Sequence, residues 1–361
     1  MNILYIGPYL QNDNWGNKSI NLLSCLYKTG HNIIARPIIY RKDVIQPQRS
    51  QAEEDSLPES YDVIIQHCLP DNFCYTSGCK NILYVDFETF NLSNANCIES
   101  IKMADEVWVN NEITKQELLG YGIKCKAINQ GINLLQVPKD IPTDAEKEFL
   151  SNICLDNFIF CASIDEESDQ SIIEIRNAFK IAFKSIPKVK LIISGGTLDE
   201  INNKLIKDTY SPFNYNQENI ILLGRDSQIR ESILYQNIDC FITNSRSPSL
   251  LFNVLKSIAY HKPVICLDKH HIANSKFNKA CFVSDSFLDI CELSVEHRGT
   301  TDFGSVEELS IRTPLVNLVH VLSNVYNNQF EYQKVLKQAA YLSTEVLIDS
   351  CYKEIGESLN D

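Results

Sequence analysis

The sequence predicts an α/β protein with two doubly wound domains, each built on a parallel sheet, and a helical C-terminal segment. Short apolar runs alternate with helical patterns along most of the 361 residues, and a polar interval, PKDIPTDAEKEFLSN, separates two such series. Continuous apolar runs between helices are typical of parallel strands covered on both faces. The length also favours two domains, because a single core rarely grows beyond about 250–300 residues. We expect domains over residues 1–138 and 139–313, followed by helices over 314–361.

The first series of expected elements covers the start of the chain. NILYIG (2–7) is an apolar run that ends in glycine, and residues 17–29 carry apolar side chains at helical spacing. Gly30 then ends this helix and NIIARPI forms the next apolar run, so a β-α-β unit is expected. The same pattern predicts strands at 61–67, 81–87, 106–111 and 126–131, and helices at 97–103 and 114–120.

The second series follows the polar interval, which has the composition of a linker with a short helix. It predicts strands at 157–163, 189–196, 219–224, 239–245 and 263–268, and helices at 171–185, 198–208, 228–236 and just before HKPVI. Because doubly wound sheets bind ligands at the carboxyl ends of their strands, we expect the two domains to face each other across a cleft.

Composition excludes several classes of protein. The chain is 44% hydrophobic and 22% charged, which is typical of a globular protein, and it has no apolar run of membrane-spanning length and no basic start before a long apolar core. Its 13 cysteines are scattered without metal-ligand spacing, so we expect no metal and a reducing cytoplasm. The net charge of −13 without a Lys/Arg block argues against a nucleic-acid partner.

The order of motifs resembles family 4 retaining glycosyltransferases of the GT-B fold, which pair two Rossmann-like domains. The resemblance rests on IGPYLQNDNWGNKSINLLSCLYKTGHNI, MADEVWVNNEITKQELLGYGI, KAINQGIN and ILYQNIDCFITNSRS followed by HKPVI. It implies transfer of a hexosyl group from a nucleotide sugar, of the UDP- or GDP-sugar type, to an unidentified acceptor, with retention and without metal or other cofactor. It also implies that the first domain lies on the acceptor side and the second on the nucleotide-sugar side.

In the first domain, the resemblance implies a ligand-binding loop over residues 7–17, with Trp15, Gly16 and Asn17 just before the helix. Glycine there lets backbone N–H groups approach a diphosphate at a helix N-terminus, although an ordinary βα loop with Trp15 packed as a lid explains the same residues. His67 and Glu88 follow expected strands and are the candidate catalytic residues.

Plainer interpretations remain open for three of the candidates in this half of the chain. His67 can be a hydrogen-bonded loop histidine, whereas Glu88 in DFETF would have its pKa raised if it were buried. Gly131 matches the family's glycine where the chain turns towards the second domain, but it can equally be an ordinary turn residue.

The second domain departs from the family pattern where the donor would bind. Acidic SIDEESDQ (163–170) stands where the family usually carries Arg and Lys, and a diphosphate there would meet like charges. Counting back from HKPVI places Pro248 and Lys256 at the family's two glutamates. Lys256 could meet a phosphate or be a solvated helix lysine.

Other groups in the second domain still fit an anionic ligand. Ser245, Arg246 and Ser249 precede an expected helix, and Leu250 lies where close approach of the backbone would favour glycine. Arg225 is a further candidate for the diphosphate, with an ion pair to Asp226 or Glu231 as the plainer interpretation.

These substitutions leave two functions open. The first is an active glycosyltransferase, and the second is a catalytically inactive GT-B protein that acts as a binding or partner subunit, for a protein partner or a second copy of itself. A dinucleotide-dependent oxidoreductase fits less well, because IGPYLQNDNWGN lacks the Gly-x-Gly-x-x-Gly spacing.

Overall fold

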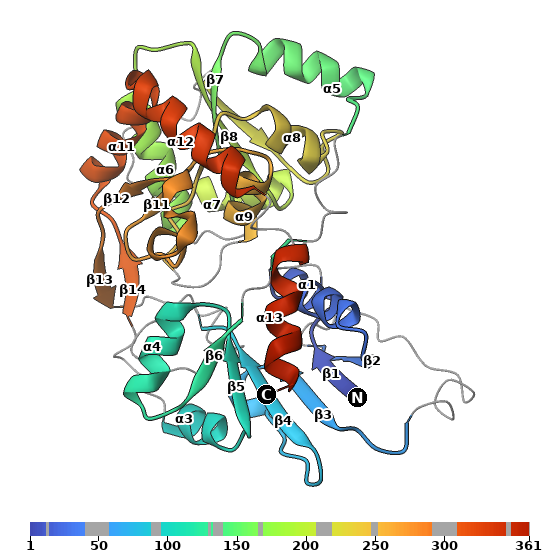
Figure 1. The fold of residues 1–361 in the computed structure, drawn as a ribbon. Coiled ribbons are helices and arrows are strands. Elements are labelled where there is room, and N and C mark those ends of the chain that lie inside the picture. The colour runs from blue at the N-terminus through green and yellow to red at the C-terminus, as the bar shows by residue number, and fades with distance from the viewer. Residues whose placement is uncertain are drawn as a thin grey trace.

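The computed structural model contains two α/β domains, one above the other in Figure 1, with the last helix returning to the first domain. It describes residues 1–11, 14–39, 58–87, 95–128, 131–132, 140–164, 169–206, 219–246, 252–290, 309–343 and 348–360. The prediction of two doubly wound domains with C-terminal helices is confirmed.

The N-terminal domain is built on a six-stranded parallel sheet in the order β2-β1-β3-β4-β5-β6. Its strands are β1 (Asn2–Gly7), β2 (Asn32–Pro37), β3 (Val63–His67), β4 (Lys80–Val85), β5 (Glu106–Val109) and β6 (Cys125–Ala127), and its helices are α1 (Asn14–Lys28), α3 (Ala95–Lys102) and α4 (Glu112–Gly120). All five residues of β3 are buried, as expected for a strand covered on both faces. The strand order reverses between β1 and β3, and doubly wound sheets bind ligands at such a switch point.

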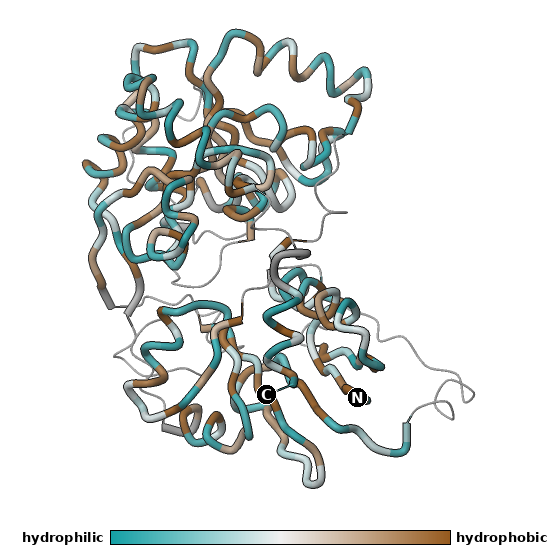
Figure 2. The backbone as a smooth tube through the Cα atoms, viewed as in Figure 1, coloured by the Kyte–Doolittle hydropathy of each residue, from teal (hydrophilic) through white to brown (hydrophobic). Residues whose placement is uncertain are grey.

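The C-terminal domain has a second six-stranded parallel sheet, in the order β12-β11-β10-β7-β8-β9, with its switch point between β7 and β10. Its strands are β7 (Phe158–Ser163), β8 (Val189–Ser194), β9 (Ile220–Leu223), β10 (Cys240–Ile242), β11 (Val264–Leu267) and β12 (Cys281–Ser284), and its helices are α5 (Asp144–Phe149), α6 (Asp169–Ala182), α7 (Leu198–Ile206), α8 (Glu231–Asn237) and α9 (Phe252–Ala259). Figure 2 shows hydrophobic residues concentrated along the strands of the two sheets.

The C-terminal helices divide between the two domains. Helices α11 (Leu315–Asn327) and α12 (Gln329–Leu342) contribute Leu318 and Tyr332 to the core of the C-terminal domain. Helix α13 (Ile348–Asn360) instead packs against α1 and places Ile355 and Leu359 in the core of the N-terminal domain. No helix among the described residues is both long and apolar enough to cross a membrane.

Two elements differ from the sequence-based expectation. Helix α1 begins at Asn14 rather than at residue 17, so Trp15, Gly16 and Asn17 form its first turn instead of a loop. A Cβ on Gly16 would lie 1.8 Å from the Gln11 carbonyl oxygen, which explains why glycine is needed there. The antiparallel pair of β13 (Phe287–Ile290) and β14 (Leu309–Arg312) was not expected.

Candidate functional site

On the N-terminal side, polar side chains surround the carboxyl ends of β1 and β3. The Tyr5 hydroxyl lies 2.6 Å from Ser19 Oγ and 3.1 Å from His67 Nδ1. Tyr5, Ser19 and His67 are all buried, so the first strand, the first helix and the third strand are joined by hydrogen bonds at the switch point. Gly7 ends β1 beside them, and a Cβ there would lie 2.6 Å from the Tyr5 hydroxyl.

His67 is held between aromatic rings but keeps one nitrogen without a partner. The Trp15 ring stacks on it at 6.1 Å between centroids, and the Tyr84 ring meets it edge-on at 4.6 Å. Its Nε2 is buried and makes no hydrogen bond. Burial, assisted by the charge of Lys18, lowers the pKa of His67 to about 3, so the ring is neutral near pH 7. A neutral imidazole with a bare nitrogen can exchange one hydrogen bond with a ligand hydroxyl.

A second buried polar group lies at the ends of β4 and β5. The Lys18 ammonium forms an ion pair with Asp86, and Asn110 donates a hydrogen bond to the other carboxylate oxygen. Asn111 in turn donates to Asn110 and accepts from the Thr114 N–H at 2.8 Å, which caps α4. The sequence interpretation missed Lys18, Asp86 and Asn110. Asp86 and Asn110 each directly follow a strand, and Lys18 lies in the first helix next to Asn17, so the same positional signal that selected the other residues could have found them.

On the C-terminal side, the segment after β10 is held firmly in place. The Ser245 carbonyl accepts a hydrogen bond from His270 Nε2 at 2.5 Å, and the Ser245 N–H donates to Thr243 Oγ1 at 3.2 Å. His270 Nδ1 accepts from the Leu267 N–H, which fixes the proton on Nε2. The turn next to the switch point is therefore positioned by two buried side chains, Thr243 directly after β10 and His270 in the segment after β11.

Arg246, a predicted ligand-binding residue, is paired with a carboxylate from α6. Its guanidinium lies 3.2 Å from Glu174 Oε1, and the Asn244 amide donates to Glu174 Oε2 at 2.7 Å. Glu174 thus positions the Arg246 side chain next to the carboxyl ends of β7 and β10.

The other candidates in this domain lie further along the sheet edge. Arg225 lies after β9 and is exposed, and its backbone N–H donates to the Gly196 carbonyl at 2.6 Å. Lys256 is paired within the protein: its ammonium lies 2.8 Å from Glu231 Oε2 and 4.8 Å from the Phe252 ring centroid. Glu231 is therefore the partner of Lys256.

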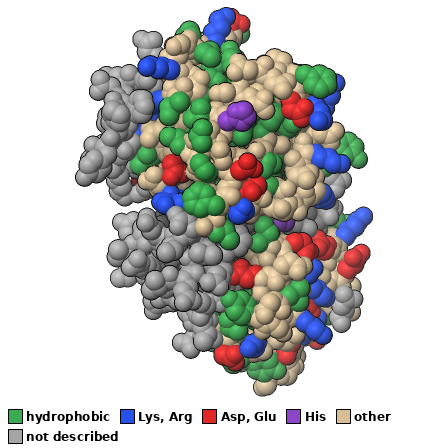
Figure 3. All heavy atoms as spheres, turned by 90° about the vertical axis from the view of Figure 1, so that its left-hand side faces the viewer, with side chains coloured by type: hydrophobic (Ala, Val, Ile, Leu, Met, Phe, Trp, Pro, Cys, Tyr) green, Lys and Arg blue, Asp and Glu red, His purple; other side chains and the backbone are tan. Residues whose placement is uncertain are grey.

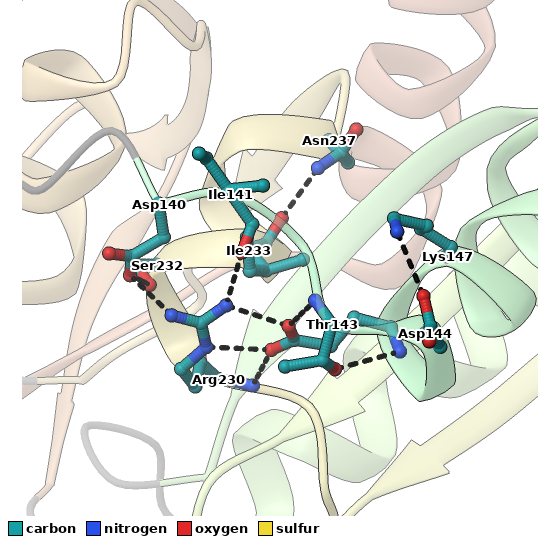
Figure 4. Close-up of polar contacts among 10 residues, drawn as sticks. Asp140, Ile141, Thr143, Asp144, Lys147, Arg230, Ser232, Ile233 and Asn237 are labelled. Carbon is teal, nitrogen blue, oxygen red and sulfur yellow. Dashed lines mark hydrogen bonds and ion pairs between the residues drawn. The ribbon is translucent and has the colours of Figure 1, made fainter.

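Figure 4 shows a further cluster that the sequence did not indicate, between α5 and the start of α8. Glu146 accepts from the Arg230 N–H, Nε and Nη2 at 3.0, 2.9 and 2.7 Å, and from the Thr143 N–H at 2.8 Å. Nη2 of Arg230 also donates to the Ile141 carbonyl at 2.8 Å. These contacts fasten the segment that enters the C-terminal domain to the loop that carries Arg225.

Among the predicted residues, the structure brings Trp15 next to His67 in the N-terminal domain. Ser245 and Arg246, which are consecutive in the sequence, lie after β10 in the C-terminal domain. Gly16 and Asn17 lie in the first turn of α1 beside Trp15, while Gly131, with φ +44°, lies where the chain leaves the N-terminal domain. A left-handed conformation explains glycine at that position. Glu88, Pro248, Ser249, Leu250 and residues 165–168 of the acidic loop at 163–170 lie outside the described residues.

No protein-family model matches the sequence, and no curated protein does. Solved structures match along the whole chain. HepE from Anabaena, solved with UDP and glucose, is 11% identical over 99% of both chains, with a TM-score of 0.64. A glycosyltransferase from Rickettsia africae is 13% identical over 100% of this chain and 98% of its own, with a TM-score of 0.64.

A third similar structure is an E. coli trehalose-6-phosphate protein bound with UDP-2-fluoro glucose, which is 10% identical over 99% of both chains, with a TM-score of 0.65. The chain has the GT-B fold. His67 lies next to the switch point of the first sheet, and Ser245 and Arg246 lie next to that of the second.

Proposed function

We propose that this protein is a glycosyltransferase that moves a hexosyl group from a UDP- or GDP-sugar to an acceptor. The observation that carries the proposal is the set of positioned polar side chains at the carboxyl ends of the strands next to both switch points. A purely structural role at the carboxyl end of β3 does not need the bare Nε2 of His67. The similar folds solved with UDP and UDP-sugars support the same ligand class.

In this proposal, the C-terminal domain binds the nucleotide sugar. Ser245 and Arg246 lie beside the diphosphate, and Arg225 and the N-terminus of α9, with Ser249 and Leu250 before it, supply further N–H groups and positive charge. The C1–O bond to the diphosphate breaks, and an acceptor hydroxyl forms the new C1–O bond on the same face of the sugar. The proton of that hydroxyl passes to the departing diphosphate oxygen, and Arg246, Arg225 and the N-terminus of α9 offset the charge that a metal would otherwise neutralise.

The N-terminal domain binds the sugar and acceptor from the opposite side. Neutral His67 exchanges a hydrogen bond with a sugar hydroxyl through Nε2, and Trp15 covers the ring. Glu88, two residues after Asp86 in the sequence, is the candidate carboxylate near the reacting carbon. Gly16, Asn17 and Gly131 shape the backbone around the ligand, and Lys256 stabilises the donor side through Glu231.

A second candidate function is a binding or partner subunit without transferase activity. The observation that favours it is the pairing of two predicted donor-site cations within the protein, Arg246 with Glu174 and Lys256 with Glu231. Each carboxylate offsets charge that a diphosphate would otherwise use.

The decisive experiment measures binding and turnover together. Calorimetry with UDP, GDP and a panel of their sugars is followed by an assay for release of UDP or GDP in the presence of mixed acceptors. We expect binding of at least one nucleotide, weakened in an Arg246→Gln variant and unchanged in an exposed control, Lys102→Gln. Release of UDP or GDP contradicts the partner subunit, whereas no binding of any nucleotide at millimolar concentration contradicts the glycosyltransferase and favours the partner subunit.

A further inference from the structure

The most exposed large apolar side chains among the described residues all lie in the C-terminal domain. Apolar side chains that are exposed singly are normal, and Figure 3 shows hydrophobic side chains at several places on one side of this domain. The most exposed ones, however, are concentrated in two segments, α12 and the segment that contains α5. They are Ile141 (85% exposed), Phe330 (82%), Tyr341 (76%), Val316 (69%) and Leu155 (67%), and only Val316, on α11, lies outside these segments.

Helix α12 carries two of these side chains on a single exposed face. Phe330, Lys334, Lys337 and Tyr341 follow one another at intervals of four, three and four residues, which places them on one face of a helix. Both lysines are exposed, and Lys334 keeps 63% of its side chain exposed although it pairs with Glu331 at 3.1 Å. We call these four residues the aromatic–lysine face. It extends over about 16 Å, the rise of eleven helical residues.

The segment that enters the C-terminal domain presents an exposed face of the opposite charge. It covers residues 141–156, which include α5, and it carries exposed apolar side chains near its two ends, at Ile141 and Leu155. Lys147 is exposed but pairs with Asp144 at 2.8 Å, so the segment remains acidic overall. We call this surface the acidic face. Its exposed carboxylates are Asp144, Glu148 and Asp156.

The aromatic–lysine face and the acidic face are neighbours on the C-terminal domain. Helix α12 contributes Ala339 to one hydrophobic core cluster, and Phe149 and Ile153 of the acidic segment pack against the same cluster. The Tyr332 hydroxyl donates to the Asp239 carbonyl at 3.1 Å, so the start of α12 lies at the amino ends of the strands, opposite to the proposed donor site. Figure 1 shows α5 and α12 in the upper part of the molecule, away from the sheet of the N-terminal domain.

We infer that these two faces join two copies of this chain in a two-fold symmetric dimer, in which the aromatic–lysine face of each copy contacts the acidic face of the other. A two-fold interface needs a surface that complements itself, and neighbouring faces of opposite charge meet this requirement. Phe330 and Tyr341 supply large aromatic anchors, which contribute most to interface energies, while the charged groups set the orientation of the two copies.

A second copy fits these surfaces better than a broad anionic partner does. The chain has a net charge of −13, and the acidic face lies beside the lysines. A membrane or nucleic-acid surface that reached Lys334 and Lys337 would therefore meet carboxylates on the same part of the domain. A second copy, in contrast, brings an acidic face to the lysines and an aromatic–lysine face to the carboxylates.

The first test measures the mass of the full chain by sedimentation velocity at protein concentrations from about 1 to 100 µM. We expect dimers to form within this range. Phe330→Ser and Tyr341→Ser should each weaken dimerisation roughly tenfold, because each removes an aromatic anchor. Met103→Ser, at a 56% exposed apolar side chain just after α3, is the matched control and should leave dimerisation unchanged. Circular dichroism and thermal melts check that every variant is folded.

The second test exchanges the charges of the two faces. Lys334→Glu with Lys337→Glu makes the first face acidic, and Asp144→Lys with Glu148→Lys makes the second face basic. Each double variant alone should stay monomeric, since like charges then meet at both contacts of the dimer. An equimolar mixture of the two should dimerise again, because both contacts of the mixed dimer join opposite charges. Lys337→Glu mixed with Glu148→Lys is a milder form of the same exchange that leaves the first turn of α5 intact.

Five outcomes overturn the inference. The wild type stays monomeric at about 100 µM, or it associates equally in Phe330→Ser and in the charge-reversed variants. The mixture of charge-reversed variants stays monomeric, or the wild type grows beyond the dimer, which would indicate a head-to-tail contact. Finally, a monomer that sediments with phosphatidylglycerol vesicles, and loses this binding in Lys334→Glu with Lys337→Glu, would assign the aromatic–lysine face to an anionic lipid surface.

Discussion

The Lys18 ammonium and the Asp86 carboxylate form an ion pair inside the N-terminal domain, with 3% and 0% of their side chains exposed. The pair joins the first helix to the end of β4, and Asn110 from the end of β5 completes the carboxylate's hydrogen bonds. Three elements of the candidate site therefore depend on one buried charge pair, since neither charge has water to solvate it if the other is removed.

Removing one member of this pair should destabilise the protein strongly. We expect Lys18→Met alone, or Asp86→Asn alone, to lower the free energy of unfolding by about 3–5 kcal/mol, because each leaves a buried polar group without its partner. The double variant should be less destabilised than the sum of the two, since no unpaired charge remains. Urea unfolding of the four proteins gives this coupling energy, and strict additivity would show that the two side chains do not interact.

His67 should make stability depend on pH. Its pKa is about 3 in the folded protein and 6.5 ordinarily, because burial penalises the charged ring. At a pH between these two pKa values, His67 binds more protons in the unfolded chain than in the folded protein. The contribution of the neutral ring to the free energy of unfolding is therefore complete above pH 6.5 and is lost as the pH falls towards 3. We expect the free energy of unfolding to fall between pH 7 and pH 4 by on the order of 3 kcal/mol more in the wild type than in His67→Phe.

The comparison with His67→Phe isolates this residue, since His271 titrates in both proteins. His271, whose pKa is lowered to about 4, contributes a similar pH dependence that cancels in the difference. Denaturant unfolding at several pH values gives the two profiles, and parallel profiles would mean that the folded His67 ring titrates at its ordinary pKa.

The strands were predictable because their signal is local. In a parallel sheet covered on both faces nearly every strand residue is apolar, as in β3 and β7, so a short run of letters is sufficient. The start of α1 was misplaced because Gly16 resembles a loop glycine, whereas its reason is contact with the Gln11 carbonyl. The β13–β14 pair was missed because it is antiparallel and does not alternate with helices.

The candidate site was only partly predictable, because partners come from distant parts of the chain. His67 and Arg246 could be selected, since each follows an expected strand. Their surroundings could not, since Glu174 is 72 residues from Arg246 and Asp86 is 68 residues from Lys18. The charges in a motif do not show which cations are already paired within the protein. Lys256 was selected as a ligand-binding residue, but in the structure it forms an ion pair with Glu231.

The pairing of Arg246 with Glu174 leads to a prediction about the proposed donor site. If Arg246 binds a diphosphate, Glu174 competes with that ligand for the guanidinium. Glu174→Gln should then bind UDP about threefold to tenfold more tightly, and Arg246→Gln should bind it about tenfold more weakly. Calorimetry measures both, with Lys102→Gln on α3 as the control. Weaker UDP binding in Glu174→Gln would instead show that Glu174 holds Arg246 in the binding orientation.

Arg230 and Glu146 should control how firmly α5 is attached to the C-terminal domain. The Glu146 side chain is fully buried, Arg230 holds its pKa well below the ordinary range, and Thr143 and Glu146 complete a capping box. The stabilisation is therefore fully present above the ordinary carboxyl pKa and is lost progressively as the pH falls from there towards the lowered pKa of folded Glu146. Arg230→Met should leave the carboxylate buried without its main partner, so the amides of 144–149 should exchange faster than in the wild type, while those of β7 change less. Thr143→Ala should lower the free energy of unfolding by about 1 kcal/mol. Hydrogen exchange at neutral pH measures the first effect, with Lys147→Gln on the same helix as the control. Equal exchange of α5 in Arg230→Met and wild type would mean that apolar contacts hold the helix without this ion pair.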